Sequence, residues 1–172
     1  MKKSTLIIGG TILLLLAAII VLAVVNSGNT RELVTGQDGA SFAINAKGET
    51  HTVTLEMLEE IGLQDFTATK KGGGGPAVEV AFQGVPLVKI CEKLGLDVAD
   101  AEGCIAVAAD GYAVPVELEK VLDPENVFIA TGEDGESLGN KDEGGDGPFM
   151  LVIAKDPFSQ YWCKFLSEVT FE

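Results

Sequence analysis

The chain has 172 residues, of which 26 are acidic and 12 are basic, so its formal net charge is −14 at pH 7. A surface this acidic repels nucleic acid and anionic lipid headgroups, which argues against both as partners held by charge. After its first 25 residues the chain has the length of one ordinary domain with a single hydrophobic core.

The N-terminal segment, residues 1–25, predicts a membrane anchor. From Leu6 to Val25 the chain has 20 residues without a charge, which as a helix would span about 30 Å of hydrocarbon. Lys2 and Lys3 precede this stretch and the next positive charge is Arg31, so the lysine bias places the N-terminus in the cytoplasm. We expect a single-pass protein of the cell membrane whose C-terminal domain is extracytoplasmic.

A cleaved signal peptide is the alternative interpretation of the same segment. Residues 25–27 weakly fit a small-residue cleavage pattern, but the apolar stretch exceeds the roughly 7–15 residues usual in such signals. Residues 26–40 are rich in Ser, Gly, Asn, Thr and Gln and predict a stalk. Residues 41–172 remain as the folded domain.

The first elements of this domain follow from local patterns. Alternating residues on either side of the turn 46–49 predict a β-hairpin over 42–54. Thr54 is a suitable helix N-cap and Gly62 a suitable stop, so the sequence predicts a short helix over 55–61.

Later elements are predicted in the same way. Asp110-Gly111 between two apolar runs is typical of a hairpin, and we expect Pro115 to end it. The other predicted elements are a strand 78–82, a turn at Gln83-Gly84, a helix from Pro86 to Gly95, a helix 116–122, buried strands 127–130 and 149–154, and a terminal strand 167–172. Strands and short helices do not alternate regularly, so the fold class is α+β.

The cysteines and the single histidine do not predict a metal or catalytic site. Cys91, Cys104 and Cys163 are widely spaced and show no zinc-ligand pattern. Cys91 shares a helix face with apolar residues and is expected in the core, whereas pairing of Cys104 with Cys163 is left open. His51 stands among threonines in a predicted strand, and we expect it to be exposed there.

Common catalytic motifs are absent from the sequence. No G-x-S-x-G elbow accompanies the single His, which argues against hydrolysis by a triad. The run Gly72 to Gly75 is not followed by Lys-Ser/Thr, and no G-x-G-x-x-G opens a helix, so these nucleotide-binding loops are also unsupported. No residue is therefore predicted to be catalytic or to bind a metal.

The loop from Thr67 to Pro76 is the main candidate site. Lys70 and Lys71 stand beside four glycines whose backbone N–H groups are able to surround an anion such as a phosphate. An exposed hairpin loop with solvated lysines is the alternative. We take Lys70, Lys71, Gly72, Gly73 and Gly74 as candidate cofactor-binding residues.

Two further features have open interpretations. The loop between Gly132 and Gly147 carries six carboxylates, which suit Ca²⁺, but their spacing fits no twelve-residue calcium loop and a solvated loop is favoured. Tyr112, Tyr161 and Trp162 are candidates to line a ligand cleft, and Tyr112 joins the candidate cofactor-binding set, while Trp162 is expected in the core.

Five segments, in order, resemble the molybdopterin-binding domain of the sulfite oxidase family. The family pattern has a G-V-P-L helix, a D-G-Y hairpin, a strand leading to D-G-x-x-L, a G-P-x-R-L-V strand and a closing W-V-K-W segment. The matching segments here are Gly84-Val-Pro-Leu87 with the helix after it, Ala109-Asp-Gly-Tyr112, residues 129–138, Gly147-Pro-Phe-Met150 with the strand after it, and Trp162-Cys-Lys-Phe-Leu166. The resemblance covers about residues 53–172.

The resemblance implies a mixed α+β fold and, in intact members, a molybdenum cofactor whose metal takes a Cys thiolate. Lys70 stands where that Cys is expected, Gly72 matches the family Gly, and Gly73 replaces an Asn. Met150 replaces the Arg of the G-P-x-R strand. An ammonium cannot supply the soft anionic donor that molybdenum takes in this family.

Three hypotheses follow. The first is a membrane-anchored, divergent member that binds a small anionic ligand or a partner protein without standard molybdenum ligation. The second is a working molybdopterin-dependent oxidoreductase subunit that holds its cofactor through Lys70 and the glycines, with a partner redox subunit. The third is a purely structural surface module. The first is favoured.

Overall fold

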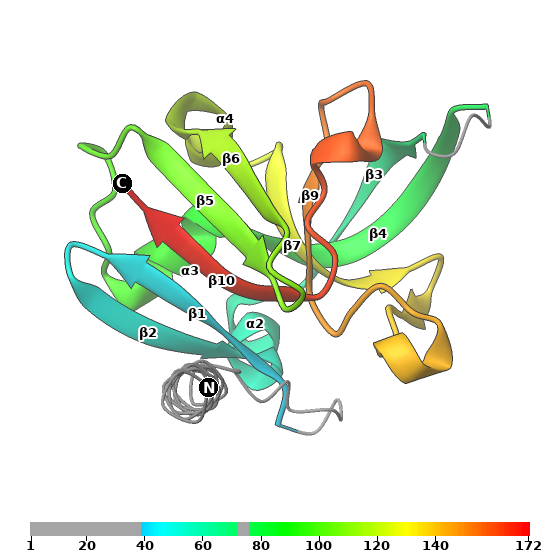
Figure 1. Ribbon diagram of the computed structural model, residues 1–172, viewed down its shortest axis with the longest axis horizontal. Helices are drawn as coiled ribbons and strands as arrows, with labels where there is room; N and C mark the ends of the chain where they lie inside the picture. The colour runs from blue at the N-terminus through cyan, green and yellow to red at the C-terminus, as the bar shows by residue number, and fades with distance from the viewer. Residues whose placement is uncertain (1–38, 72–75) are drawn as a thin grey trace, which may run out of the picture. The chain divides into compact units, whose positions relative to one another are not determined.

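The computed structural model describes residues 39–71 and 76–172, all of which belong to one compact unit, Leu33–Glu172. Within these residues ten strands form two five-stranded sheets, which three short α-helices and two 3-10 turns connect (Figure 1). The fold is mixed α+β, as predicted. No helix in the described ranges is long and apolar enough to cross a membrane, and the predicted anchor, residues 1–25, lies outside them.

The first sheet joins the two ends of the domain. Its strand order is β2-β1-β10-β5-β6, with β1 parallel to β10 and the other neighbours antiparallel. Figure 1 shows the last strand, in red, lying between the first strand and β5. The strands are β1 (Ser41–Ala46), β2 (Glu49–Thr54), β5 (Gly103–Ala108), β6 (Ala113–Glu117) and β10 (Leu166–Phe171).

The second sheet has the order β3-β4-β7-β8, and β9 also pairs with β7. All its pairs are antiparallel. The strands are β3 (Gln64–Lys70), β4 (Val78–Pro86), β7 (Val127–Glu133), β8 (Glu136–Ser137) and β9 (Met150–Ile153). Residues 67–70, which the sequence assigns to a loop, therefore belong to the edge strand β3, and Lys70 is its last residue.

Two of the three helices begin and end at the residues that the sequence predicts. In α2 (Leu55–Ile61) the hydroxyl of Thr54 accepts a hydrogen bond from the Met57 amide at 3.3 Å, which caps the helix. Pro86 precedes α3 (Leu87–Leu94), and Gly95 ends it in the left-handed conformation. The remaining elements are α4 (Leu118–Leu122) and the 3-10 turns η1 (Lys141–Glu143) and η2 (Ser159–Tyr161).

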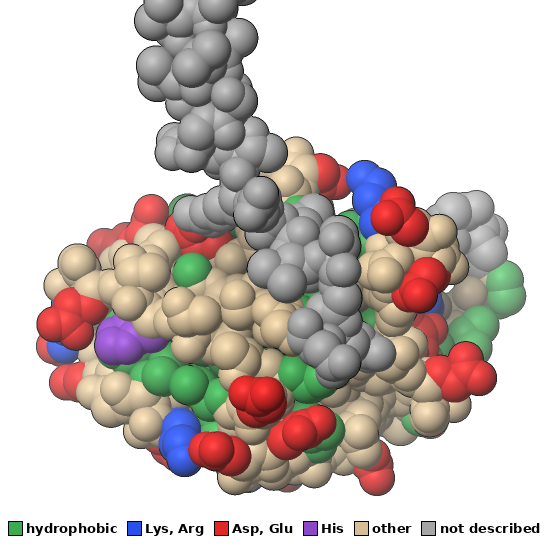
Figure 2. Space-filling view, turned by 90° about the horizontal axis from the view of Figure 1, so that it is seen from below, with side chains coloured by type: hydrophobic (Ala, Val, Ile, Leu, Met, Phe, Trp, Pro, Cys, Tyr) green, Lys and Arg blue, Asp and Glu red, His purple; other side chains and the backbone are tan. Residues whose placement is uncertain are grey.

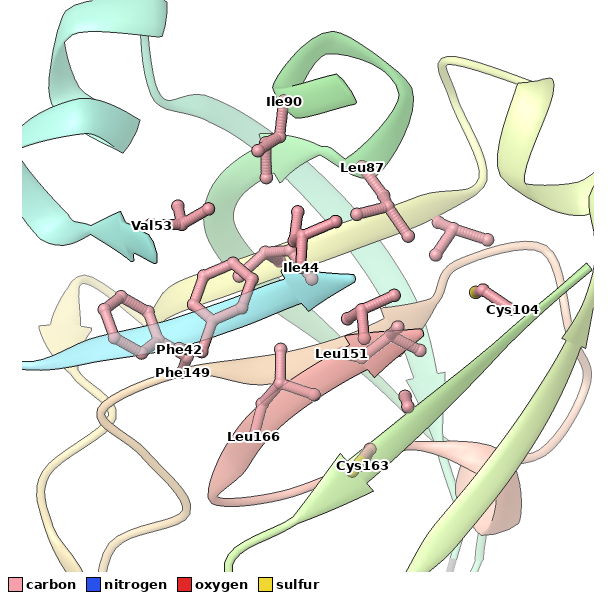
Figure 3. Packing of buried hydrophobic residues seen from close by; sticks show 14 of the residues in the cluster. Phe42, Ile44, Val53, Leu87, Ile90, Cys104, Phe149, Leu151, Cys163 and Leu166 are labelled. Atoms are coloured by element: carbon pink, nitrogen blue, oxygen red, sulfur yellow. The ribbon is translucent and has the colours of Figure 1, made fainter. Parts of the chain in front are cut away.

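The larger hydrophobic core contains side chains from both sheets. Phe42 of β1 and Phe149 meet edge to face, with ring centroids 5.1 Å apart (Figure 3). Ile44, Leu151 and Leu166, which are all nearly or fully buried, belong to the same core. Because this core receives residues from β1 and β10 as well as β9, burial of apolar area binds the two sheets together.

A smaller core packs on the other face of the second sheet. Phe82 contacts Phe66 by stacking and Trp162 edge to face, with centroids 5.5 and 5.4 Å apart. Met150 and Val152 of β9 point into this core, whereas Leu151 points into the larger one. Strand β9 is thus buried on both faces, which explains its continuous apolar sequence.

Two predictions about strand ends are wrong because of sheet context, and one of them also shifts the start of a helix. Gln83 and Gly84 were expected to form a turn but lie inside β4, where the register with β7 shifts at a bulge. Pro115 was expected to end the second hairpin strand but lies inside β6, opposite Ile105. Strand β6 is at the sheet edge, so one of its sides pairs with no other strand. Proline is tolerated there because the N–H that it lacks is not needed for pairing. The helix predicted over 116–122 accordingly begins only at residue 118.

Candidate functional site

Lys70, the last residue of β3, forms a partly buried ion pair. Its Nζ donates to both carboxylate oxygens of Glu133, at 2.6 and 2.9 Å, and lies 3.8 Å from Oδ2 of Asp146. The three side chains are 35%, 23% and 21% exposed, respectively. The ammonium is thus already neutralised by carboxylates of the chain, a state that sequence spacing alone did not indicate.

Long-range pairing of the backbone places these groups. Glu133 ends β7, which is separated from β3 by β4. Asp146 is held by its own backbone, since its N–H donates to the carbonyl of Leu138 at 3.0 Å and its carbonyl accepts from Phe165 at 3.0 Å. Its second carboxylate oxygen accepts from Lys164 Nζ at 2.8 Å. We refer to Lys70, Glu133, Asp146 and Lys164, with their alternating charges, as the Lys70 cluster.

Lys71 faces a different environment from its neighbour. Its backbone N–H donates to the Ser159 hydroxyl at 3.0 Å, and that hydroxyl donates to the Lys71 carbonyl at 2.9 Å. The Lys71 ammonium lies 5.0 Å from the centre of the Phe158 ring, a cation–π contact. Lys71 is exposed, and within the described residues it has no carboxylate partner. The end of β3 is therefore fastened to the segment 158–161.

Tyr112 reaches the same segment from the β5–β6 hairpin. Its hydroxyl donates to the carbonyl of Gln160 at 2.9 Å, and the residue is 47% exposed. Phe158 and Tyr161 are 43% and 49% exposed. We call Lys71, Tyr112, Phe158 and Tyr161 the aromatic surface. The structure thus brings two predicted site residues, Lys71 and Tyr112, to one segment.

The other predicted site residues are placed only in part. Gly72, Gly73 and Gly74 lie outside the described residues, so their proposed role as an anion nest remains a prediction. Trp162 is 4% exposed and belongs to the smaller core, as expected. Its indole N–H is buried and has no hydrogen-bond partner among the described residues.

The acidic loop is ordered by internal contacts. Asn140 and Glu143 form a reciprocal capping box around η1, with hydrogen bonds of 3.0 and 3.1 Å. Glu133 and Asp146, at its two ends, hold Lys70. Within the described residues no group of three or more His, Cys, Asp or Glu side chains is arranged to bind a metal.

The cysteines are buried free thiols. Cys91, Cys104 and Cys163 are all at most 2% exposed, so the open question of a Cys104–Cys163 disulfide is answered by two unpaired thiols. Burial raises the pKa of each thiol to about 12. None of the three supplies a thiolate at neutral pH, and Cys91 is in the core as expected.

His51 differs from its expected exposure. Its side chain is 26% exposed, and Nε2 lies 3.6 Å from Oε2 of Glu49, an ion pair only when the imidazole is protonated. It lies in β2, at the outer edge of the first sheet. The structure therefore places His51 on a different sheet from the Lys70 cluster.

The donor atoms present do not fit the molybdenum ligation of the resembled family. The position expected for the thiolate holds the ammonium of Lys70, which is bonded to Glu133. Met150, in place of the family Arg, is fully buried in β9 and has no charge to offer a phosphate or oxyanion. A soft anionic ligand is thus missing where the resemblance requires one.

A cavity of about 320 Å³ lies elsewhere, between α2 and the second sheet. Residues of α2, the adjoining segment, β3, β4 and the β7–β8 turn line it, Leu55, Glu59, Asp65 and Glu136 among them. Sequence reasoning did not find this cavity. Its lining residues come from segments far apart in the chain, and only the folded sheet brings them together.

Comparison with known proteins supports the fold predicted from the motifs. No family model and no curated protein sequence matches the chain. Among solved structures it resembles the sulfane dehydrogenase SoxCD from Paracoccus pantotrophus, with a TM-score of 0.63 and 20% sequence identity. The match covers 79% of this chain but only 39% of that one. At this identity the likeness concerns the fold alone, and it supports a distant molybdopterin-domain-like α+β fold.

Proposed function

We propose that this chain is a membrane-anchored, extracytoplasmic binding domain that uses a molybdopterin-domain-like fold without the thiolate ligation of molybdenum. One observation carries the proposal. At the position where the resembled family has its metal-binding Cys, the chain has Lys70, whose ammonium is bonded to Glu133 at 2.6 and 2.9 Å.

The chemistry of that ion pair opposes metal binding. To act as a ligand, Lys70 would have to lose its proton and leave Glu133, whose carboxylate would then remain partly buried without its partner. The buried thiols offer no substitute, because each keeps its proton at neutral pH. In this proposal the Lys70 cluster therefore stabilises the fold and is not a metal site.

The aromatic surface is the best candidate for contact with a partner protein. Exposed aromatic side chains are enriched in protein interfaces because they bury large areas at little cost in conformational entropy. Tyr112, Phe158 and Tyr161 are each more than 40% exposed, and Lys71 adds a positive charge to an otherwise acidic domain. A partner redox subunit with an acidic patch around an apolar centre would fit this surface.

A second candidate function is an oxidoreductase subunit that holds a pterin phosphate without a Cys ligand. It is favoured by the exposed ammonium of Lys71, which has no carboxylate partner among the described residues and adjoins Gly72 to Gly74. In this version Lys71 and the glycines bind the anion, and Lys70 remains with Glu133.

The two candidates differ in their absorption spectra and in the effect of one variant. Protein isolated in detergent from a host that makes molybdopterin should be colourless above 300 nm if the first is correct. A pterin spectrum that disappears in Lys71→Ala would instead establish the second.

The partner surface has its own test. We expect Phe158→Ser with Tyr161→Ser to abolish co-purification of one defined partner from the native host. Leu122→Ser, which alters an exposed apolar residue on α4, is the matched control and should retain it. Equal recovery of the partner with both variants would contradict the surface assignment.

A further inference from the structure

The cavity beside α2 combines an apolar wall with an acidic rim. Leu55 and Leu63 line it from α2 and the residues that follow this helix. The carboxylates come from three separate segments, with Glu59 on α2, Asp65 on β3 and Glu136 on β8. At about 320 Å³ the cavity is large enough for a small organic molecule.

These three carboxylates are not neutralised by the lysines of the described residues. Each ion pair of the second sheet and its neighbours uses other acids, such as Glu60 with Lys93 and Glu133 with Lys70. Among the described residues, Asp65 accepts a long hydrogen bond, 3.4 Å, from the amide of Gln83. The cavity therefore has a negative potential that adds to the acidic field of the whole domain.

The wider surface strengthens this field. Figure 2 shows acidic side chains spread across the face seen from below, with few lysines among them. Anions are repelled from such a surface, and cations are attracted to it. The low-dielectric walls of a cavity concentrate the same potential on whatever enters.

The residues that line the cavity favour an organic cation over a metal ion. Glu59, Asp65 and Glu136 do not form a group able to hold one metal, since no such group exists within the described residues. Leucine side chains in the wall offer no ligand to a hard cation, but they do bury apolar surface of a larger molecule. A positive group at the rim and an apolar body against the wall use both features together.

We propose that this cavity binds a small organic amine, a protonated or quaternary nitrogen that carries an apolar group. The cationic nitrogen lies among Glu59, Asp65 and Glu136, and the apolar group contacts Leu55 and Leu63. The site is separate from the Lys70 cluster and from the aromatic surface, so it stands whether or not the proposed function is correct.

Phenylethylammonium is a suitable probe, titrated into the full-length protein in a non-ionic detergent. Binding is followed by the methyl NMR signals of Leu55 and Leu63. Three related compounds serve as controls. Phenylethanol lacks the charge and phenylacetate reverses it. Tetramethylammonium keeps the charge but lacks the apolar group. We expect phenylethylammonium to bind more tightly than all three, and more weakly when ionic strength rises tenfold.

Variants locate the charge effect. Glu59→Gln, Asp65→Asn and Glu136→Gln should each weaken binding about twofold to fivefold, as expected for exposed charges. Glu60→Gln is the matched control, because it lies next to Glu59 on α2 but pairs with Lys93 outside the cavity lining. It should change the affinity by less than any of the three.

Three results would overturn the proposal. These are equal binding of phenylethanol or phenylacetate, an effect of Glu60→Gln as large as that of Glu59→Gln, and unchanged methyl signals of Leu55 and Leu63 up to the solubility limit of the probe. Ala81→Leu gives an independent check, because residue 81 lines the cavity at an exposed strand position where a larger side chain is tolerated. It should block binding while leaving the thermal midpoint nearly unchanged.

Discussion

The ammonium of Lys70 lies 2.6 and 2.9 Å from the two carboxylate oxygens of Glu133, although strand β4 separates β3 from β7 in the sheet. We expect Lys70→Met to lower the free energy of unfolding by about 1–3 kcal/mol, because Glu133 would keep its partly buried charge without a cation, while Asp146 would retain its pair with Lys164. Urea denaturation monitored by circular dichroism measures the change.

A double-mutant cycle separates the ion pair from other effects of this substitution. The double variant, Lys70→Met with Glu133→Gln, should lose less unfolding free energy than the sum of the losses in the two single variants. Lys93→Met is the control, since its exposed pair with Glu60 at 3.4 Å should contribute less than about 1 kcal/mol. Additive effects for Lys70 and Glu133 would show that the pair contributes no coupling energy.

The buried thiols predict a loss of stability in alkali. Burial raises the native pKa of Cys91, Cys104 and Cys163 from 9.0 to about 12, so the unfolded chain loses these protons first. Their contribution to the unfolding free energy is fully present below pH 9 and is lost as pH rises from about 9 to about 12. Each thiol should steepen the fall in unfolding free energy by about 1.4 kcal/mol per pH unit.

Cys91→Ala tests that slope. The variant should lose overall stability through its cavity, but its unfolding free energy should fall less steeply between pH 9 and 11 than that of the parent. Val98→Ala, which also truncates a side chain of the larger core but removes no titrating group, should keep the parent slope. A Cys91→Ala slope equal to that of the parent would contradict the raised pKa.

Close approach of two strands makes Gly84 sensitive to substitution. A Cβ at this position would collide with the backbone carbonyl of Ile129, so Gly84→Ala should destabilise the domain by about 1–3 kcal/mol. Gly48→Asn is the comparison, because Gly48 has a positive φ in open space and Asn tolerates that conformation. It should change the thermal midpoint little, and equal losses in the two variants would refute the steric explanation.

How much the sequence predicts depends on whether the cause is local. The hairpin of β1 and β2, the Thr54 cap of α2 and the Asp110-Gly111 hairpin all follow from residues adjacent in the chain, and the structure contains them. Gly84 inside β4 and Pro115 inside β6 were missed because a strand's neighbours in the sheet decide which residues it tolerates.

The candidate site was predictable only in part for the same reason. The family motifs placed Lys70 at the critical position, but its partner Glu133 is 63 residues away and was interpreted as part of a solvated loop. The meeting of Lys71 and Tyr112 at residues 158–161 also depends on tertiary packing. The cavity beside α2 had no sequence signal, since its carboxylates come from three separate elements.

The membrane anchor remains a prediction of the sequence. Leu14→Arg with Leu15→Arg places two charges in the middle of residues 6–25, which should prevent stable insertion. We expect the parent chain to stay in the membrane fraction after alkaline carbonate extraction and the variant to leave it. A parent that is extracted completely would favour a cleaved signal or a peripheral association.

The molar ratio of molybdenum to protein tests the central claim most directly. It is measured by mass spectrometry of metals on full-length protein purified from a molybdopterin-synthesising host grown with excess molybdate. Because Lys70 is bonded to Glu133 and supplies no thiolate, the ratio should stay well below one tenth. A ratio near one that is lost on Lys70→Met would contradict this account and make Lys70 part of a metal cofactor site.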